Sequence, residues 1–202
     1  MSLNLDPLAR SVELASGFTV GDYGDAVNNH NRNAIAEAVH RRFTERYLMP
    51  VTDPAAKRHG FTMMAIACLM IEALQSFRRG WPDTSQRGQG EQAFCSFFDS
   101  EDDFAPFRGH AHDFYKGVRC GILHQAETSL GWRIRRERDL LATDRGSRTI
   151  NAKKFVAALQ KTLDKYRDAL KKAEWDDESW VLLRKKMERV CANCTSGSPG
   201  AV

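Results

Sequence analysis

Residues 61–77 read FTMMAIACLMIEALQSF, and this run decides the fold. A helix that is apolar around most of its surface is buried on several sides. In this run, apolar residues lie around most of the helix: Phe61, Met64, Ala65, Cys68, Leu69, Ile71, Ala73, Leu74 and Phe77. We therefore expect a central core helix that begins at Asp53-Pro54, runs to Arg79 and stops at Gly80.

Apolar residues at helical spacing predict further helices on both sides of this run. The expected ranges are 31–48, which Pro50 would end, then 91–98, 104–124, 151–173 and 178–190. Alternation over 131–135 predicts a short strand, and 140–150 is expected to return as a hairpin through Asp144-Arg145-Gly146. The expected fold class is mainly α, a helical bundle with a small β-hairpin insertion.

Composition and local patterning give the expected organisation. The chain has 202 residues, 42% hydrophobic and 28% charged, which fits a soluble globular protein. We expect a loose N-terminal arm over 1–28 with one short helix at most, a single helical domain over 29–192 and a disordered tail over 193–202. The arm lacks the apolar run of a secretory signal, and no apolar stretch of about 18 residues is free of charge. A cytoplasmic location without a membrane partner is therefore expected.

The distribution of charge and the cysteine content limit which ligands and partners can be expected. Residues 133–154 hold eight basic side chains against three acidic ones, which suits either a polyanion-binding surface or a solvated basic face. The isolated pair Cys191 and Cys194 is a weak zinc signal, since no second pair accompanies it. No metal and no cofactor are expected.

The segment 114–124, FYKGVRCGILH, contains the main candidate functional residues, an arginine and a histidine. Arginine is a permanent forked cation suited to phosphate, and histidine exchanges a proton near neutral pH. Arg119 and His124 lie five residues apart, about 140° round an ideal helix, and so do not share a face. A loosened last turn, the long arginine stem, a groove or a second subunit could bring both to one ligand.

Two glycines in the same segment predict a close contact. Gly117, Gly121 and His124 share one face, and helical glycine costs about 1 kcal/mol relative to alanine. Another backbone is expected against this face, either from a partner helix, a nucleic acid strand or ordinary packing within the chain. Glu72, inside the apolar half of the central helix, is expected to pair with an arginine or a helix end, which leaves open that Arg119 is its structural partner.

The string Arg119-Cys-Gly-Ile-Leu-His124, followed by Gln125-Ala126-Glu127, resembles the Arg-x(4–6)-His motif of the HEPN superfamily, the higher eukaryotes and prokaryotes nucleotide-binding domains. The resemblance extends to helical architecture over about 30–190. It implies a helical bundle that forms a homodimer and acts as a metal-independent endoribonuclease in toxin, phage-defence or RNA-processing systems. Many family members carry a polar residue such as Asn after the arginine, where this chain has Cys120.

The resemblance also implies roles for individual residues. His124 would act as general base or acid and Arg119 would hold the scissile phosphate, giving a 2′,3′-cyclic phosphate. The candidate substrate contacts are Tyr115, Lys116, Arg133 and Arg135, and the candidate supporting residues are Glu72, Cys120, Gly117 and Gly121. Expected partners are RNA, a second copy, and an antitoxin or defence-system protein. The alternative is a non-catalytic helical module that binds RNA, a nucleotide or a protein.

Overall fold

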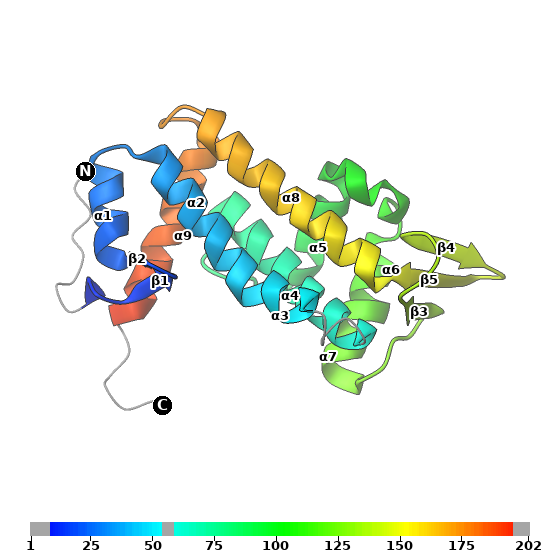
Figure 1. Ribbon diagram of the computed structural model, residues 1–202. Helices are drawn as coiled ribbons and strands as arrows, with labels where there is room; N and C mark the ends of the chain where they lie inside the picture. The colour runs from blue at the N-terminus through cyan, green and yellow to red at the C-terminus, as the bar shows by residue number, and fades with distance from the viewer. Residues whose placement is uncertain (1–8, 54–58, 196–202) are drawn as a thin grey trace. The chain divides into compact units, whose positions relative to one another are not determined.

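The computed structural model describes residues 9–53 and 59–195, and its described part is mainly helical, as predicted (Figure 1). The α-helices are α1 (Val20–Asn28), α2 (Arg32–Phe43), α3 (Met49–Thr52), α4 (Gly60–Arg79), α5 (Gln89–Ser100), α6 (Ala111–Phe114), α7 (Gly121–Gln125), α8 (Ala152–Lys172) and α9 (Glu178–Thr195). Tighter or wider turns form η2 (Thr44–Leu48, π), η4 (Asp102–Phe107, 3-10) and η5 (Tyr115–Cys120, π). The strands are β1 (Glu13–Ala15), β2 (Phe18–Thr19), β3 (Trp132–Arg135), β4 (Leu141–Asp144) and β5 (Ser147–Asn151).

The chain groups into two compact units, where the sequence predicts one domain. Unit 1 comprises Met1–Glu45, Ser76–Pro82 and Leu163–Val202. Unit 2 comprises Arg46–Gln75 and Asp83–Thr162. Helices α4 and α8 therefore contribute residues to both units, and the Arg119/His124 segment belongs entirely to unit 2.

The core of unit 2 is a cluster of aromatic rings. Its fully buried members are Phe94, Phe97, Phe98, Phe104, Phe107, Phe114 and Phe155. Neighbouring rings meet at centroid distances such as 4.8 Å for Phe104 and Phe155, mostly in tilted or edge-to-face contact. Each buried aromatic ring removes about 150–250 Å² from water, so this cluster dominates the apolar burial of the unit. The cluster fixes α5, η4 and α6 against the start of α8.

Helix α4 is the buried helix that the sequence predicts. Met64, Cys68, Ile71 and Leu74 are each at most 1% exposed. The helix is long and apolar enough to cross a membrane by length and composition, and 61% of the relevant stretch is buried within the protein. Gly80 follows it with a φ of +62°, the left-handed stop expected there. The expected start at Asp53-Pro54 falls partly on 54–58, outside the described residues, and α4 begins at Gly60.

The N-terminal arm contains the one short helix that the prediction allows and, in addition, a pair of strands. Within the described residues of 1–28, β1 pairs with β2 and α1 follows. Thr19 and Asp22 form a reciprocal capping box at the start of α1, and Val20 and Tyr23 are fully buried. The glycines of this segment suggest a loop, yet the cap and an apolar face that packs near α2 outweigh them.

Helix boundaries and the β insertion also differ in detail. The helix expected over 31–48 continues through η2 and α3 to Thr52, because Pro50 lies in the first turn of α3, where its missing N–H costs nothing. The helix expected over 104–124 is divided into η4, α6, η5 and α7, with Pro106 and the left-handed Gly109 at the break. Helix α9 continues to Thr195, and the rest of the tail expected over 193–202 lies outside the described residues.

The expected hairpin is confirmed, and the third strand joins it on the opposite side. β4 and β5 pair antiparallel, with Asp144 opposite Ser147 across the Arg145-Gly146 turn. β3 pairs in parallel with β5, which gives the order β3-β5-β4. Asn151 ends β5 and caps α8, since its side-chain oxygen accepts from the backbone N–H groups of Lys153 and Lys154.

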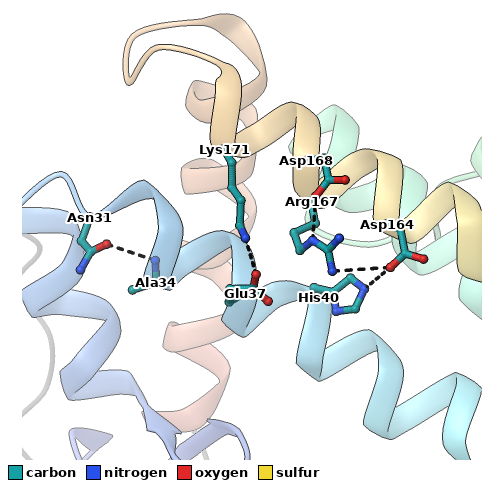
Figure 2. A network of polar contacts seen from close by, with 8 residues as sticks. All are labelled: Asn31, Ala34, Glu37, His40, Asp164, Arg167, Asp168 and Lys171. Carbon is teal, nitrogen blue, oxygen red and sulfur yellow. Dashed lines mark hydrogen bonds and ion pairs between the residues drawn. The ribbon is translucent and has the colours of Figure 1, made fainter.

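Unit 1 is held by apolar burial and by a polar network between α2 and the end of α8. Trp180 is fully buried, and its indole N–H donates to the carbonyl oxygen of Leu170 at 2.9 Å. Figure 2 shows Glu37 facing Lys171, and His40 and Arg167 both facing Asp164. His40 Nε2 and the Asp164 carboxylate are 2.7 Å apart.

The ion pair between Glu37 and Lys171 makes the stability of unit 1 depend on pH. The hydrogen bond from Lys171 holds the pKa of Glu37 below its ordinary value. Its stabilising effect is therefore complete above the ordinary glutamate pKa of about 4.3 and is lost as the pH falls below it. We predict that Glu37→Gln lowers the free energy of unfolding by up to about 1 kcal/mol at pH 7, as partly exposed pairs do.

Urea denaturation of wild type and variant at pH 7 and pH 3.5 measures this difference, which should shrink at the lower pH. Glu188→Gln is the matched control, because Glu188 is exposed and forms no ion pair within the described residues. A difference between wild type and Glu37→Gln that stays constant or grows at pH 3.5 would contradict the assignment.

Candidate functional site

The Arg119/His124 segment is one continuous helical stretch with a widened middle. It runs through α6, η5 and α7, and the π-helical turn η5 contains Arg119. π turns within α-helices occur frequently at functional sites. The 140° separation of an ideal α-helix does not hold across such a turn, because its hydrogen bonds join residues five apart instead of four. Ala126, with a φ of +55°, ends the stretch and places His124 in its last turn, as expected.

Arg119 forms an ion pair with Glu72 of α4. Its Nε donates to Glu72 Oε1 at 2.7 Å and its Nη2 to Oε2 at 3.4 Å. The hydroxyl of Thr84 donates to the same Oε2 at 2.9 Å. The side chains are 19% and 9% exposed, so the pair is mostly shielded from water. Burial is the largest single effect on the pKa of Arg119 and lowers it, but the hydrogen bond to Glu72 and the negative charges nearby together outweigh burial, so the pKa is raised.

Tyr115 lies beside Arg119 at the edge of the core. The Arg119 guanidinium carbon is 5.5 Å from the centroid of the Tyr115 ring, within cation–π range. The ring packs on Phe94 at 5.6 Å and against Gly90, where an added Cβ would lie 2.9 Å from the tyrosine hydroxyl. Burial raises the pKa of Tyr115, with a smaller contribution from its neighbour Cys120. Tyr115 therefore helps to orient Arg119 and is itself partly buried.

His124 is exposed to solvent. Among the described residues its imidazole forms no hydrogen bond, ion pair or ring contact, so both ring nitrogens are accessible to a ligand. An accessible imidazole can take and release a proton near neutral pH. The two motif residues thus differ in their surroundings, since Arg119 is held by Glu72 and His124 is held by the helix end alone.

The two glycines contact the chain's own loop, which is the within-chain alternative considered for them. The backbone N–H of Ser129 donates to the carbonyl oxygen of Gly117 at 2.8 Å. A Cβ on Gly117 would lie 2.6 Å from Trp132, and one on Gly121 would lie 2.5 Å from the carbonyl oxygen of Glu127. The loop after α7 therefore folds back onto the glycine face and connects the motif helix to β3.

The remaining candidate residues lie in two other places. Lys116 is exposed and lies 3.7 Å from the carboxylate of Glu91, which also binds His112. The hydrogen bond from His112 lowers the pKa of Glu91. Arg133 and Arg135 are exposed on β3 and line a surface groove with the start of α4. The structure therefore brings Glu72, Tyr115, Arg119 and Cys120 together, and it groups the two sheet arginines separately.

Two contributors to the site were not expected from the sequence. Thr84 comes from the polar stretch between α4 and α5, where the sequence carries no periodic signal. Trp132 fills the space over Gly117, although its strand could be predicted from alternation. Within residues 9–53 and 59–195, no group of three or more His, Cys, Asp or Glu side chains has the arrangement of a metal site.

Comparison with family models, curated proteins and solved structures yields no match for this chain. The resemblance to the HEPN superfamily therefore remains a prediction that rests on the Arg-x4-His string and the helical architecture.

The loop contact makes a prediction about Gly121. Gly121→Ala gains about 1 kcal/mol of helix propensity, but its Cβ would meet the Glu127 carbonyl oxygen at 2.5 Å, and overpacking costs about 1–3 kcal/mol or more. We expect a net loss in the free energy of unfolding, measured by urea denaturation. The control is Gly60→Ala, where the nearest atoms are side-chain carbons 3.4 Å away. A Gly121→Ala protein as stable as the Gly60→Ala protein would refute the contact.

The ion pair between Glu72 and Arg119 leads to a second prediction. Glu72→Met leaves the Arg119 guanidinium shielded and uncompensated, and Arg119→Met does the same to the carboxylate. Each should lower the free energy of unfolding by about 2 kcal/mol, less than a fully buried pair because Arg119 keeps some exposure. The double variant should recover much of that loss. A double-mutant cycle by urea denaturation measures the coupling, and strictly additive effects would mean that the two groups do not interact.

Proposed function

We propose that this protein is a metal-independent endoribonuclease of the HEPN type, with Arg119 and His124 as its catalytic pair. The observation that carries the proposal is a solvent-accessible imidazole one turn beyond a guanidinium that Glu72 and Tyr115 hold in place. A fixed cation and a titratable imidazole are the two groups that phosphodiester cleavage by an internal hydroxyl requires. The sequence context Arg119-x4-His124 supports the same assignment.

In the proposed reaction, His124 removes the proton of a ribose 2′-hydroxyl, and that oxygen attacks the adjacent phosphorus. The bond from phosphorus to the 5′-oxygen breaks, and the leaving oxygen takes up a proton from an imidazolium or from water. The products are a 2′,3′-cyclic phosphate and a 5′-hydroxyl. Among the described residues, Nη1 of Arg119 has no hydrogen bond, so it can donate to the phosphate while Nε and Nη2 stay on Glu72.

The resemblance extends the proposal to assembly and context. A homodimer would supply a second imidazole, so that one His124 acts as base and the other as acid. The proposed setting is cytoplasmic, in a toxin or phage-defence system with an antitoxin or other defence partner. Cys120, which follows the arginine, lies beside Tyr115 and contributes to its surroundings.

The test is cleavage of single-stranded RNA by the purified protein in EDTA. We predict 2′,3′-cyclic phosphate ends, no cleavage of the matched DNA, and at least a 100-fold lower rate for His124→Ala, since general acid–base catalysis contributes about 10²–10⁴-fold. Arg119→Lys should also lose most activity, because lysine keeps the charge and lacks the fork that serves Glu72 and phosphate together.

The control variant is His112→Ala, which removes an exposed histidine of the same helical stretch and should leave the rate unchanged. Circular dichroism spectra of all variants should match wild type. RNA that stays intact under these conditions at dimer-forming concentrations would rule out the nuclease.

The ion pair itself favours a second candidate, a non-catalytic helical module that binds RNA, a nucleotide or a protein. In that case Glu72 neutralises Arg119 for structural reasons and His124 is an unremarkable surface residue. The same experiment separates the two, because a binding module would retain RNA affinity in both variants and cleave nothing in any of them.

A further inference from the structure

A surface groove lies over β3, outside the motif helix. It encloses about 890 Å³ and lies between the start of α4 and the β3-β5-β4 sheet of unit 2. Four arginines line it, namely Arg133, Arg135, Arg136 and Arg138. Three acidic residues also line it, Glu127, Glu137 and Asp144, which leaves a net charge of +1 from the four positive and three negative groups.

Two of the groove's arginines, Arg133 and Arg135, are available to a ligand. Arg133 and Arg135 are exposed, and they alternate along β3 with the less exposed Trp132 and Ile134, which also line the groove. Within the described part of the chain neither guanidinium forms an ion pair, and Arg135 donates only to the neighbouring carbonyl of Ile134. By contrast, the Glu127 carboxylate already accepts from the backbone N–H of Thr128 at 2.9 Å. The two charged side chains of β3 are therefore positive and form no ion pair among the described residues, while the acidic residues of the groove lie outside this strand.

An exposed aromatic ring lies in the same groove. Phe61, in the first turn of α4, is 38% exposed although the rest of the helix is largely buried. Proteins that bind single-stranded nucleic acid combine a positive groove with aromatic rings on which bases stack. The hydroxyls of Thr128, Ser147 and Thr149 add donors and acceptors for sugar and phosphate oxygens.

The groove is continuous with the motif helix. Glu127 and Trp132, which line it, are the residues that contact Gly121 and Gly117. Glu127 follows His124 by three residues, so their Cα atoms are at most about 11 Å apart. A nucleic acid strand that lies in the groove can therefore extend to His124 along the surface of unit 2.

We infer that this groove binds the single-stranded flank of the RNA substrate, with Arg133 and Arg135 on phosphates and Phe61 stacked on a base. The inference rests on the proposed function for the identity of the ligand and adds to it a preference for unpaired RNA. A duplex has its bases stacked on one another and offers none to Phe61, so it should bind more weakly.

The experiment measures binding apart from cleavage. A fluorescein-labelled 12-nucleotide single-stranded RNA is titrated with the full-length His124→Ala protein in EDTA, and anisotropy is followed at several salt concentrations. Adding Phe61→Ala should weaken binding about tenfold. Adding Arg133→Ala and Arg135→Ala together should reduce the slope of log K against log salt by about 1.4, since each phosphate contact on a single strand contributes about 0.7.

The matched control is Lys161→Ala, which removes an exposed positive charge of unit 2 outside the groove and should change neither quantity. Unchanged affinity in both groove variants, with native circular dichroism spectra, would overturn the inference while leaving any cleavage activity intact. If the groove variants weaken binding but the wild-type protein cleaves no RNA, the result would support the inference and rule out the proposed nuclease activity. Competition by poly-glutamate as strong as by RNA of equal charge would overturn it in favour of an acidic protein partner.

Discussion

The contact between the loop after α7 and the two glycines of the motif helix is the constraint on which the geometry of unit 2 depends. Without side chains, Gly117 and Gly121 admit a backbone to distances that any Cβ would forbid. The loop then leads directly into β3, whose Trp132 covers Gly117 and packs on the phenylalanine cluster at Phe107 and Phe114. The position of the sheet in unit 2, and therefore of its arginines, depends on Gly117 and Gly121, which have no side chain.

The ion pair between Arg119 and Glu72 has two consequences that oppose each other. It orients the guanidinium through two hydrogen bonds and makes the contact between the motif helix and α4 specific. It also occupies two of the three guanidinium nitrogens. A buried pair contributes little net stability, because desolvation offsets attraction. The pair is therefore better explained as a means of orientation than as a source of stability, and it leaves Nη1 without a hydrogen bond among the described residues.

The sequence predicts the helical class, the buried α4 and the β4-β5 hairpin, because each depends on local periodicity or turn chemistry. It also predicts the pairing of Glu72 as an alternative, since a carboxylate among apolar residues needs a partner. The β3 pairing with β5 and the contribution of Thr84 could not be predicted, because both depend on which distant segments meet. The order of the N-terminal segment was underestimated, since its glycines obscure the Thr19–Asp22 cap.

A guanidinium neutralised by a carboxylate 2.7 Å away acts on its surroundings as a dipole, and the potential of a dipole falls with distance much faster than that of a single charge. Arg119 therefore cannot attract a polyanion from afar, and it becomes effective only once a phosphate is in contact. Under the proposed function, capture of RNA from solution would depend instead on charges without an ion pair, such as those of β3, whose field reaches about a Debye length, roughly 8–10 Å at moderate salt. The first encounter with the proposed substrate and its final positioning would thus depend on different parts of unit 2.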